Sequence, residues 1–282
     1  MVENRPALTF LAHATLILGA ALMAAPVWLA FVASTYPGAD FVSGRLPLWP
    51  GSQFLANYGT VLSQGLSNAG APPIAGMLIN SIIVAVLIAV GKIAVSLLSA
   101  FAIVYFRFPF RAAAFWIIFL TLMLPVEVRI LPTFEVVSQL GLLNSYAGLS
   151  IPLIASATAT FLFRQFFMTI PDELTEAARI DGATPLRFLR DILLPLSRTN
   201  ITALFVILFI YGWNQYLWPL LVTNSPAMTT IVIGIRQMIG NGDAQTAWQL
   251  VMATALLAML PPIAVVLAMQ RWFVAGLIEP EK

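Results

Sequence analysis

Six long apolar runs limit what this sequence can fold into more than any other feature. Each holds about 20 residues or more, which is enough for a helix to cross the roughly 30 Å hydrocarbon core of a bilayer. Because the runs are continuous and do not alternate, they favour helices, which satisfy their own backbone hydrogen bonds in lipid, over a β-barrel. We therefore expect one all-α membrane domain over residues 1–282 with six transmembrane helices, at 8–34, 74–104, 112–133, 146–168, 199–222 and 248–271.

The composition excludes a water-soluble protein. Apolar residues make up 60% of the chain and charged residues only 9%, too few to cover a surface that faces water. The net charge of +2 is too small to indicate a nucleic-acid partner. The chain has no cysteine and a single histidine, His13, so we expect neither a catalytic site nor a metal site.

The first apolar run, 8–34, shares two features with a secretory signal, namely Arg5 before it and small residues near Ala33 and Ser34. Its apolar stretch is far longer than the core of a normal signal peptide. We interpret it as a retained membrane span.

The basic residues predict the orientation of the chain. If the N-terminus is cytoplasmic, the outer segments hold only Arg45, Arg129 and Arg236, and Lys92 lies within a span. The other lysines and arginines fall on the inner side, as expected when positive loops stay in the cytoplasm. The sequence therefore predicts that both termini are cytoplasmic.

One segment between the fourth and fifth runs, residues 169–200, has the polarity of a soluble protein. Pro171 fits the first turn of a short helix, and Gly182 fits the left-handed residue that ends it. The pair at 184–185, Thr and Pro, is a second helix start. Pro195 interrupts this second helix before the fifth run begins.

The first helix of this segment is suited to binding a protein partner. Leu174, Ala177, Ala178 and Asp181 fall near one face at helical spacing, and the two small alanines permit close approach by a partner. The alternative is a helix lying on the lipid surface, which requires large apolar residues with basic flanks. This helix has four acidic residues and one arginine instead.

The same residues carry a resemblance to a known family. The spacing of Glu176-Ala177-Ala178, Gly182, Ile192 and Leu194-Pro195 resembles the cytoplasmic signature of the permease subunits of binding-protein-dependent ABC importers. The chain is most similar to the carbohydrate-type, maltose-permease-like members, and within them to the smaller permease of sn-glycerol-3-phosphate importers. The stretches that carry this closer similarity are 98–111, 122–137, 156–174 and 210–221.

The resemblance implies a transport subunit in a bacterial inner membrane. Its partners would be a homologous second permease, two ATP-binding subunits and a periplasmic substrate-binding protein. The helix at 170–183, with Glu176, Ala177, Ala178, Asp181 and Gly182, would couple it to the ATPase. The solute implied is sn-glycerol 3-phosphate, with a glycerophosphodiester or another sugar as alternatives, imported by alternating access.

The chain itself has no recognisable nucleotide site. The nearest match to a phosphate-binding loop is Gly91-Lys92, but Val86 replaces the first glycine and Ile93 the Ser or Thr. We therefore expect no cofactor in this chain, with ATP and Mg²⁺ bound by the partner ATPase. A gradient-driven carrier is the rival hypothesis, although it would need carboxylates within its spans, and these are lacking. A membrane-embedded enzyme would need a catalytic constellation, which the residues do not provide.

Two cations are candidates for the path of an anionic solute. Lys92 lies within the second run, where an ionisable group normally faces a cavity or a partner. Arg129 lies near the outer end of the third run. The alternatives are pairing of Arg129 with Glu127 or Glu135, and snorkelling or a structural hydrogen bond for Lys92.

A group of aromatic and amide residues follows in the outer half of the fifth run. Trp213 and Trp218 fit an interfacial belt, whereas Asn214 and Gln215 would be costly facing lipid. We therefore include all four as candidates for a polar wall of the translocation path. By resemblance to maltose-type permeases, the loop at 223–247, with its tip at 241–243, would reach into the cleft of the binding protein.

Overall fold

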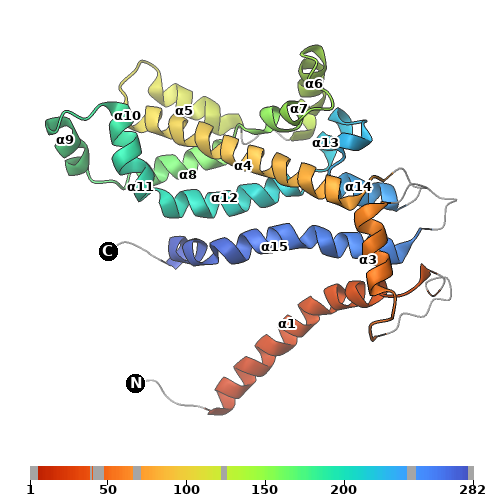
Figure 1. Cartoon of the computed structure of the whole chain (residues 1–282). Coiled ribbons are helices and arrows are strands. Elements are labelled where there is room, and N and C mark those ends of the chain that lie inside the picture. The colour runs from red at the N-terminus through yellow and green to blue at the C-terminus, as the bar shows by residue number, and fades with distance from the viewer. Residues whose placement is uncertain are drawn as a thin grey trace. The chain divides into compact units, whose positions relative to one another are not determined.

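The computed structural model describes residues 6–38, 40, 48–65, 71–121, 126–239 and 246–278, and their main elements are helices (Figure 1). Contacts divide the chain into two compact units, one of residues 1–75 and 234–260 and the other of residues 76–233 and 261–282. Three helices contribute to both units, namely α4 (Ile74–Tyr105), α14 (Ile231–Met238) and α15 (Trp248–Ile278).

The first unit contains α1 (Pro6–Ser34), whose end is joined to α3 (Phe54–Ser63) by polar contacts. The Asn57 amide donates hydrogen bonds to the carbonyls of Ser34 and Tyr36, at 2.8 and 3.0 Å. Most of α1 is exposed, including leucines along its length. An apolar helix with so little protein cover is suited to lipid contact.

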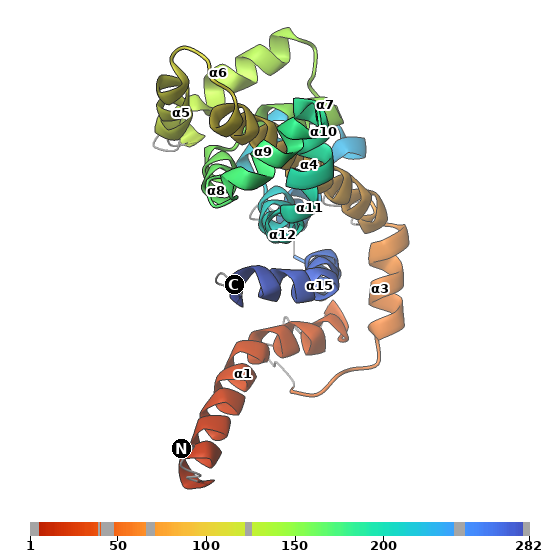
Figure 2. The ribbon, with the colours of Figure 1, turned by 90° about the vertical axis from the view of Figure 1, so that its left-hand side faces the viewer.

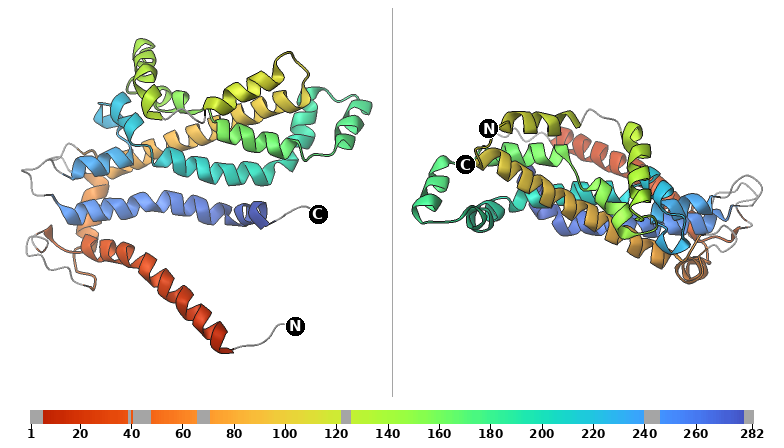
Figure 3. Two further views of the ribbon diagram at one scale, coloured as in Figure 1. Left: turned by 180° about the vertical axis from the view of Figure 1, so that it is seen from behind. Right: turned by 90° about the horizontal axis from the view of Figure 1, so that it is seen from above.

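The second unit is built around α4. Figures 1 and 3 show α8 and α12 running alongside it. Its core joins Val84 and Ile88 of α4 to Leu149 and Trp218 from later helices. The other elements of this unit are α5 (Arg111–Leu120), α6 (Val126–Gln139), α7 (Tyr146–Ser150), α8 (Ala157–Phe167), α9 (Asp172–Ile180), α10 (Pro185–Phe188), α11 (Leu194–Leu196), α12 (Arg198–Trp213) and α13 (Leu217–Val222), with a π-helical turn at Leu189–Leu193 and 3₁₀ turns at Ile151–Leu153 and Pro226–Met228.

Three of the predicted spans are confirmed as single helices long and apolar enough to cross a membrane, namely Leu8–Ser34, Ile74–Tyr105 and Trp248–Gln270. Counting each bent helix pair as one span raises the number to five in the described chain. The third predicted span, 112–133, is not one continuous helix within the described residues. Its apolar part, α5, has only 10 residues, and α6 begins after residues 122–125, which lie outside the described chain.

The fourth predicted span, 146–168, is broken. Its two parts, Tyr146–Leu153 and Ala157–Phe167, meet at an angle of 51°. Pro152 lacks the backbone donor that a continuous helix needs. Ser156 then begins α8 by accepting a hydrogen bond from the Ala159 amide at 3.3 Å, as an N-cap residue does.

The fifth predicted span, 199–222, also differs from a continuous helix. The helix α12 ends at Trp213, and α13 begins at Leu217. At its other end, α12 meets the segment Pro185–Leu196 at an angle of 74°. The chain therefore changes direction at both ends of α12. One end adjoins the polar segment 169–200, and the other adjoins the amides Asn214 and Gln215.

A glycine allows α12 to pack closely on α4. A Cβ atom at Gly212 would lie 2.9 Å from the Cα of Ala85, so the two backbones would have to separate to accept it. We expect Gly212→Ala to lower stability by about 1–2 kcal/mol, since overpacking outweighs the gain in helix propensity. The melting temperature of the purified protein in detergent measures this loss of stability.

The matched control for that change is Gly76→Ala, at an exposed position of α4 where an added Cβ meets no atom within 4 Å. This variant is expected to be as stable as the wild type or slightly more stable. Equal melting temperatures for the two variants would contradict the close packing of α4 and α12.

Candidate functional site

The polar segment after α8 begins with the expected short helix, α9. Its N-cap is Pro171, and Asp172 and Glu173 lie in its first turn, where negative charge complements the helix dipole. At its end, Gly182 has φ +68°, and the amides of Gly182 and Ala183 donate to the carbonyls of Arg179 and Ala178, at 3.0 and 2.9 Å. This is a Schellman stop, so the prediction of a left-handed residue at Gly182 is confirmed.

The helix α9 projects from the end of the second unit (Figures 1 and 2). Glu176, Ala177 and Asp181 are exposed, whereas Ala178 is only 7% exposed. The two alanines thus do different things: Ala177 is open to a partner, and Ala178 packs within the chain itself. The neighbouring side chain of Ile180 is 85% exposed and adds apolar surface to α9. The sequence did not indicate this residue, because Ile180 falls outside the helix face predicted from helical spacing.

Aromatic contacts attach the segment after α9 to the membrane helices. Phe188 is buried, and its ring lies 5.2 Å from the ring of Tyr105 at the end of α4. The Tyr105 hydroxyl donates to the carbonyl of Phe167, at the end of α8, at 3.3 Å. These contacts hold α10, α4 and α8 together at one end of the unit. The segment after α9 is therefore packed on the end of α4 and joined through Tyr105 to the end of α8.

The second part of the polar segment carries an ion-paired group on its exposed side. Asp191 Oδ1 lies 2.7 Å from Arg190 Nε, and Asp191 Oδ2 lies 3.4 Å from Arg187 Nε. The hydrogen bond from Arg190 holds the pKa of the Asp191 carboxyl below its usual value. These exposed pairs contribute little to stability.

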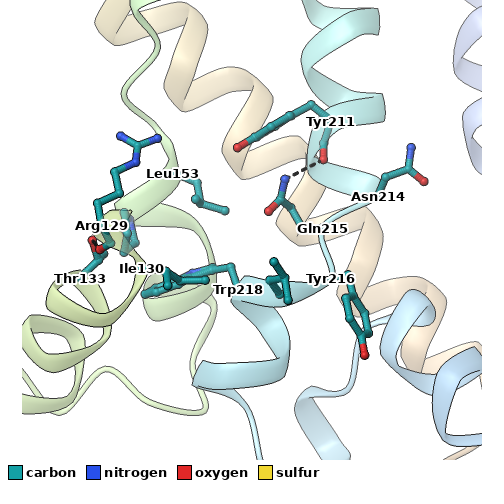
Figure 4. A pocket seen from close by; sticks show the side chains of 11 residues that line it. Arg129, Ile130, Thr133, Leu153, Tyr211, Asn214, Gln215, Tyr216 and Trp218 are labelled. Carbon is teal, nitrogen blue, oxygen red and sulfur yellow. Dashed lines mark hydrogen bonds between the residues drawn. The ribbon is translucent and has the colours of Figure 1, made fainter. Parts of the chain in front are cut away.

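Several of the predicted path residues meet at a cavity of about 300 Å³ (Figure 4). Arg129 and Thr133 of α6 lie on one side, and Gln215 lies on the other (Figure 4). The lining also includes Asn214 and Trp218, both predicted, and Tyr211, which was not. Of the six candidates for the path, four therefore line this cavity.

The two amides are placed by the end of α12. The Gln215 and Asn214 amide groups donate to the carbonyls of Tyr211 and Ile210, four residues earlier, at 3.1 and 3.0 Å. A helix leaves its last carbonyls without intrahelical partners. The Gln215 side chain supplies one for Tyr211, whereas the Ile210 carbonyl accepts from both the backbone amide and the side chain of Asn214. Polar amides at this position therefore end the helix and line the cavity.

The two tryptophans have other roles. Trp213 is not among the lining residues of this cavity. It is buried and stacks on Phe209, with ring centroids 5.9 Å apart. Trp218 is buried too, and its indole N–H donates to the Gly148 carbonyl at 3.0 Å. Both tryptophans pack within the second unit, and their place in the translocation path stays a prediction.

Lys92 and Arg129 line a second cavity, of about 360 Å³. Lys92 is only 7% exposed, and its ammonium lies 4.0 Å from the ring centroid of Tyr211. That ring also borders the first cavity. Arg129 lines both cavities, so the two share this residue in their linings. Tyr211 could have been found from its spacing, four residues before Gln215 on one helix.

The cavity with Lys92 also faces the start of α8. Ser156, Ala157 and Thr158 are among its lining residues. The first turn of a helix presents backbone N–H groups without intrahelical acceptors and the positive end of the dipole. Among the residues that the structure describes, no acidic residue lines either cavity. Cations and backbone donors without a counter-charge favour an anionic ligand.

The alternative of an ion pair for Arg129 is not supported by the described side chains. Glu135 accepts a hydrogen bond from Gln139 at 3.3 Å, and the salt bridges of the described chain do not include Arg129. The side chain of Glu127 lies outside the described part. Lys92 makes a cation–π contact with Tyr211, and its role in the path stays a prediction.

The outer loop at 223–247 is described only in part. Its first residues are held by Asn80, whose amide donates to the carbonyls of Ala227 and Thr229, at 2.9 and 3.0 Å. The hydroxyl of Tyr146 lies 2.7 Å from Asn80 Oδ1. The predicted tip at 241–243 lies outside the described residues.

Comparison with known proteins decides the family. Residues 93–279 match the binding-protein-dependent transport system inner membrane component family. The chain belongs to this family. This permease is therefore the inner membrane component of such a system, and its membership implies an ATPase and a binding protein as partners.

Full-length relatives give a closer similarity. The permease is 59% identical to the sn-glycerol-3-phosphate transport system permease protein UgpE of Rhizobium meliloti and to that of Agrobacterium fabrum, and 58% identical to that of Salmonella typhi. Each alignment covers 100% of both chains. Among solved structures, a bacterial ABC transporter that imports the acidic polysaccharide alginate matches with a TM-score of 0.81 and 23% identity, over 97% of this chain and 99% of that one. This similarity shows a shared helical permease fold.

Proposed function

We propose that this permease moves sn-glycerol 3-phosphate, or a glycerophosphodiester, from the periplasm to the cytoplasm by alternating access. The observation that carries this proposal is a pair of cavities that share Arg129, one of them also lined by Lys92, with no acidic residue among their described lining residues. Full-length relatives at 57–59% identity carry the name of this transport system, which agrees with a cationic path.

The charges in the cavities suit a phosphate group. An arginine guanidinium binds phosphate oxygens through two parallel hydrogen bonds, and a lysine ammonium adds a point charge. Arg129 and Lys92 would share the phosphate with the backbone amides at the start of α8, near Ala157 and Thr158. A transporter must release its solute, so none of these groups can bind the phosphate too tightly. Contacts that are divided between two cavities meet this requirement.

The uncharged part of the solute would be bound in the other cavity. Thr133, Tyr211, Asn214 and Gln215 provide hydroxyl and amide groups there, and such groups hydrogen-bond to the hydroxyls of glycerol. Trp218 contributes an apolar surface. The contribution of Trp213 would be to hold α12 in place through its stacking on Phe209.

Energy would enter through α9. Its exposed residues Glu176, Ala177 and Asp181, and its stop at Gly182, fit a short rigid helix that docks into a groove of the ATPase. The ATPase would bind ATP and Mg²⁺, and its closure would move α4 and α8 through the contacts of Phe188 and Tyr105. The complete transporter would contain this permease, a homologous second permease, two ATPase subunits and a periplasmic binding protein.

The proposed topology has six spans with both termini in the cytoplasm. The excess of basic residues in the predicted inner segments supports it. In this topology α5 and α6 together form the third span, and the segment at 169–200 is cytoplasmic. The permease would lie in the bacterial inner membrane.

The proposal is tested by purifying the permease with its partners in proteoliposomes and measuring ATP-dependent uptake and ATPase stimulation. sn-Glycerol 3-phosphate, a glycerophosphodiester and uncharged sugars are compared as solutes. We expect the two phosphate esters to stimulate both activities and the sugars to have no effect. Stimulation by a sugar alone would indicate a sugar importer, and uptake by the isolated permease without ATPase would indicate a gradient-driven carrier; either result contradicts the proposal.

A further inference from the structure

A third cavity, of about 420 Å³, lies where α4 and α8 end and α5 begins. Its charged lining residues are Arg111, in the first turn of α5, and Arg164, in the last turn of α8. No acidic residue is among the described residues that line it. It shares no residue with the two cavities that contain Arg129.

Arg164 is held in place but lacks a partner for one of its donors. Its guanidinium carbon lies 4.3 Å from the ring centroid of Phe115, so the side chain is fixed by a cation–π contact. Its Nε is buried and has no hydrogen-bond partner in the described part of the chain. A buried donor on a charged group is costly without a partner, so the described chain leaves part of the hydrogen-bonding capacity of this guanidinium unused.

Arg111 provides the second charge at the rim of the same cavity. It is exposed, and the ion pairs of the described residues do not include it. Arg164 alone could be explained by its favourable position at the C-terminal end of α8, where a cation complements the helix dipole. That explanation leaves Arg111 and the unpaired Nε of Arg164 without a role.

The surroundings place this cavity at the surface of the membrane. Met168 and Trp116, which line it, are 56% and 57% exposed. Tryptophan is enriched at the depth of lipid headgroups, and basic pockets between helices at this depth bind anionic headgroups. Only four residues separate the end of α8 from the start of α9, so the cavity lies on the side of the membrane from which α9 projects.

We propose that Arg111 and Arg164 bind the phosphate group of an anion at this membrane surface. Two guanidinium groups supply paired N–H donors that match phosphate oxygens. The phosphate comes from an anionic lipid headgroup or from a soluble phosphate compound in the adjoining water. This inference does not depend on which solute the permease transports.

The test uses the purified permease in its complete transporter complex and the variants Arg111→Gln, Arg164→Gln and Arg107→Gln. Arg107 is an exposed arginine on the same connection that does not line the cavity, so it controls for loss of a charge. Native mass spectrometry compares retention of phosphatidylglycerol and of zwitterionic phosphatidylethanolamine. A separate titration with inorganic phosphate follows the melting temperature of each complex.

If the phosphate belongs to a lipid, phosphatidylglycerol binding falls at least about tenfold in the Arg111 and Arg164 variants, while Arg107→Gln and phosphatidylethanolamine binding stay unchanged. If it belongs to a soluble compound, inorganic phosphate stabilises the wild type and the Arg107 variant but neither of the other two. The inference is overturned if all variants respond as the wild type does, or if Arg107→Gln loses as much binding as the others. If Arg164→Gln fails to assemble, Arg111→Gln still decides the test, because the Arg111 side chain is exposed and its replacement should not disturb folding.

Discussion

Replacing Ala177 by tryptophan is expected to reduce ATP-driven uptake about 100-fold while leaving membrane insertion intact. Ala177 is exposed on the projecting α9, so the larger side chain clashes with no part of this chain. It would instead block close contact with the proposed ATPase partner, and a loss of about 2.7 kcal/mol at that contact corresponds to 100-fold. Uptake and solute-stimulated ATPase activity are measured in proteoliposomes that contain all partners.

The control for this change is Leu11→Trp, at an exposed position of α1, which is expected to transport as the wild type does. Ala178→Trp gives a contrasting result. Because Ala178 is buried within the chain, this variant is expected to lower the stability of the permease itself. Full uptake and full ATPase stimulation in Ala177→Trp would rule out α9 as the coupling contact.

Gly182 offers a second way to disturb the same helix, through the backbone conformation that ends it. An added Cβ there meets no atom within 4 Å, but its φ of +68° disfavours any residue with a side chain. Gly182→Val is therefore expected to loosen the stop of α9 by about 1 kcal/mol or more. Its effect on uptake should be in the same direction as that of Ala177→Trp and smaller.

Loss of the charge at Arg129 is the second change for which a large effect is expected. Arg129→Gln should reduce uptake of sn-glycerol 3-phosphate about 10- to 100-fold, because a charge-assisted contact to phosphate contributes about 1.5–3 kcal/mol. Arg129→Lys keeps the charge and should retain part of the activity. Initial rates of uptake of radiolabelled sn-glycerol 3-phosphate by the complete transporter measure this effect.

A matched control exists on the same predicted side of the membrane. Arg236 is exposed, donates to the Ile239 carbonyl at 3.2 Å and lines none of the three cavities. Arg236→Gln is expected to leave uptake unchanged. If Arg129→Gln and Arg236→Gln transport equally well, Arg129 does not bind the phosphate, even where the coupling prediction for α9 holds.

Replacing Lys92 tests the proposed solute path independently of Arg129. Its ammonium is held over the ring of Tyr211 at 4.0 Å, so Lys92→Met removes the charge and keeps much of the side-chain volume. This variant should resemble Arg129→Gln in uptake. Tyr211→Phe, which preserves the ring, should keep the cation in place and have a milder effect.

The sequence determined the features that depend on neighbouring residues. The apolar runs predicted the three long single helices, because the energy of placing residues in lipid depends on local composition. The stop at Gly182 and the start at Thr184, whose hydroxyl accepts from the Arg187 amide at 3.3 Å, were also predicted, because caps involve residues only a few positions apart.

The tertiary structure decided what depends on distant parts of the chain. The sequence could name Lys92 and Arg129, but only the fold places them on one cavity and adds Tyr211, which contacts Lys92 and lines the other cavity. It also separates Ala177 from Ala178 and assigns Trp213 to packing. Helical periodicity cannot make these distinctions, because burial depends on which segments far apart in sequence pack against each helix face.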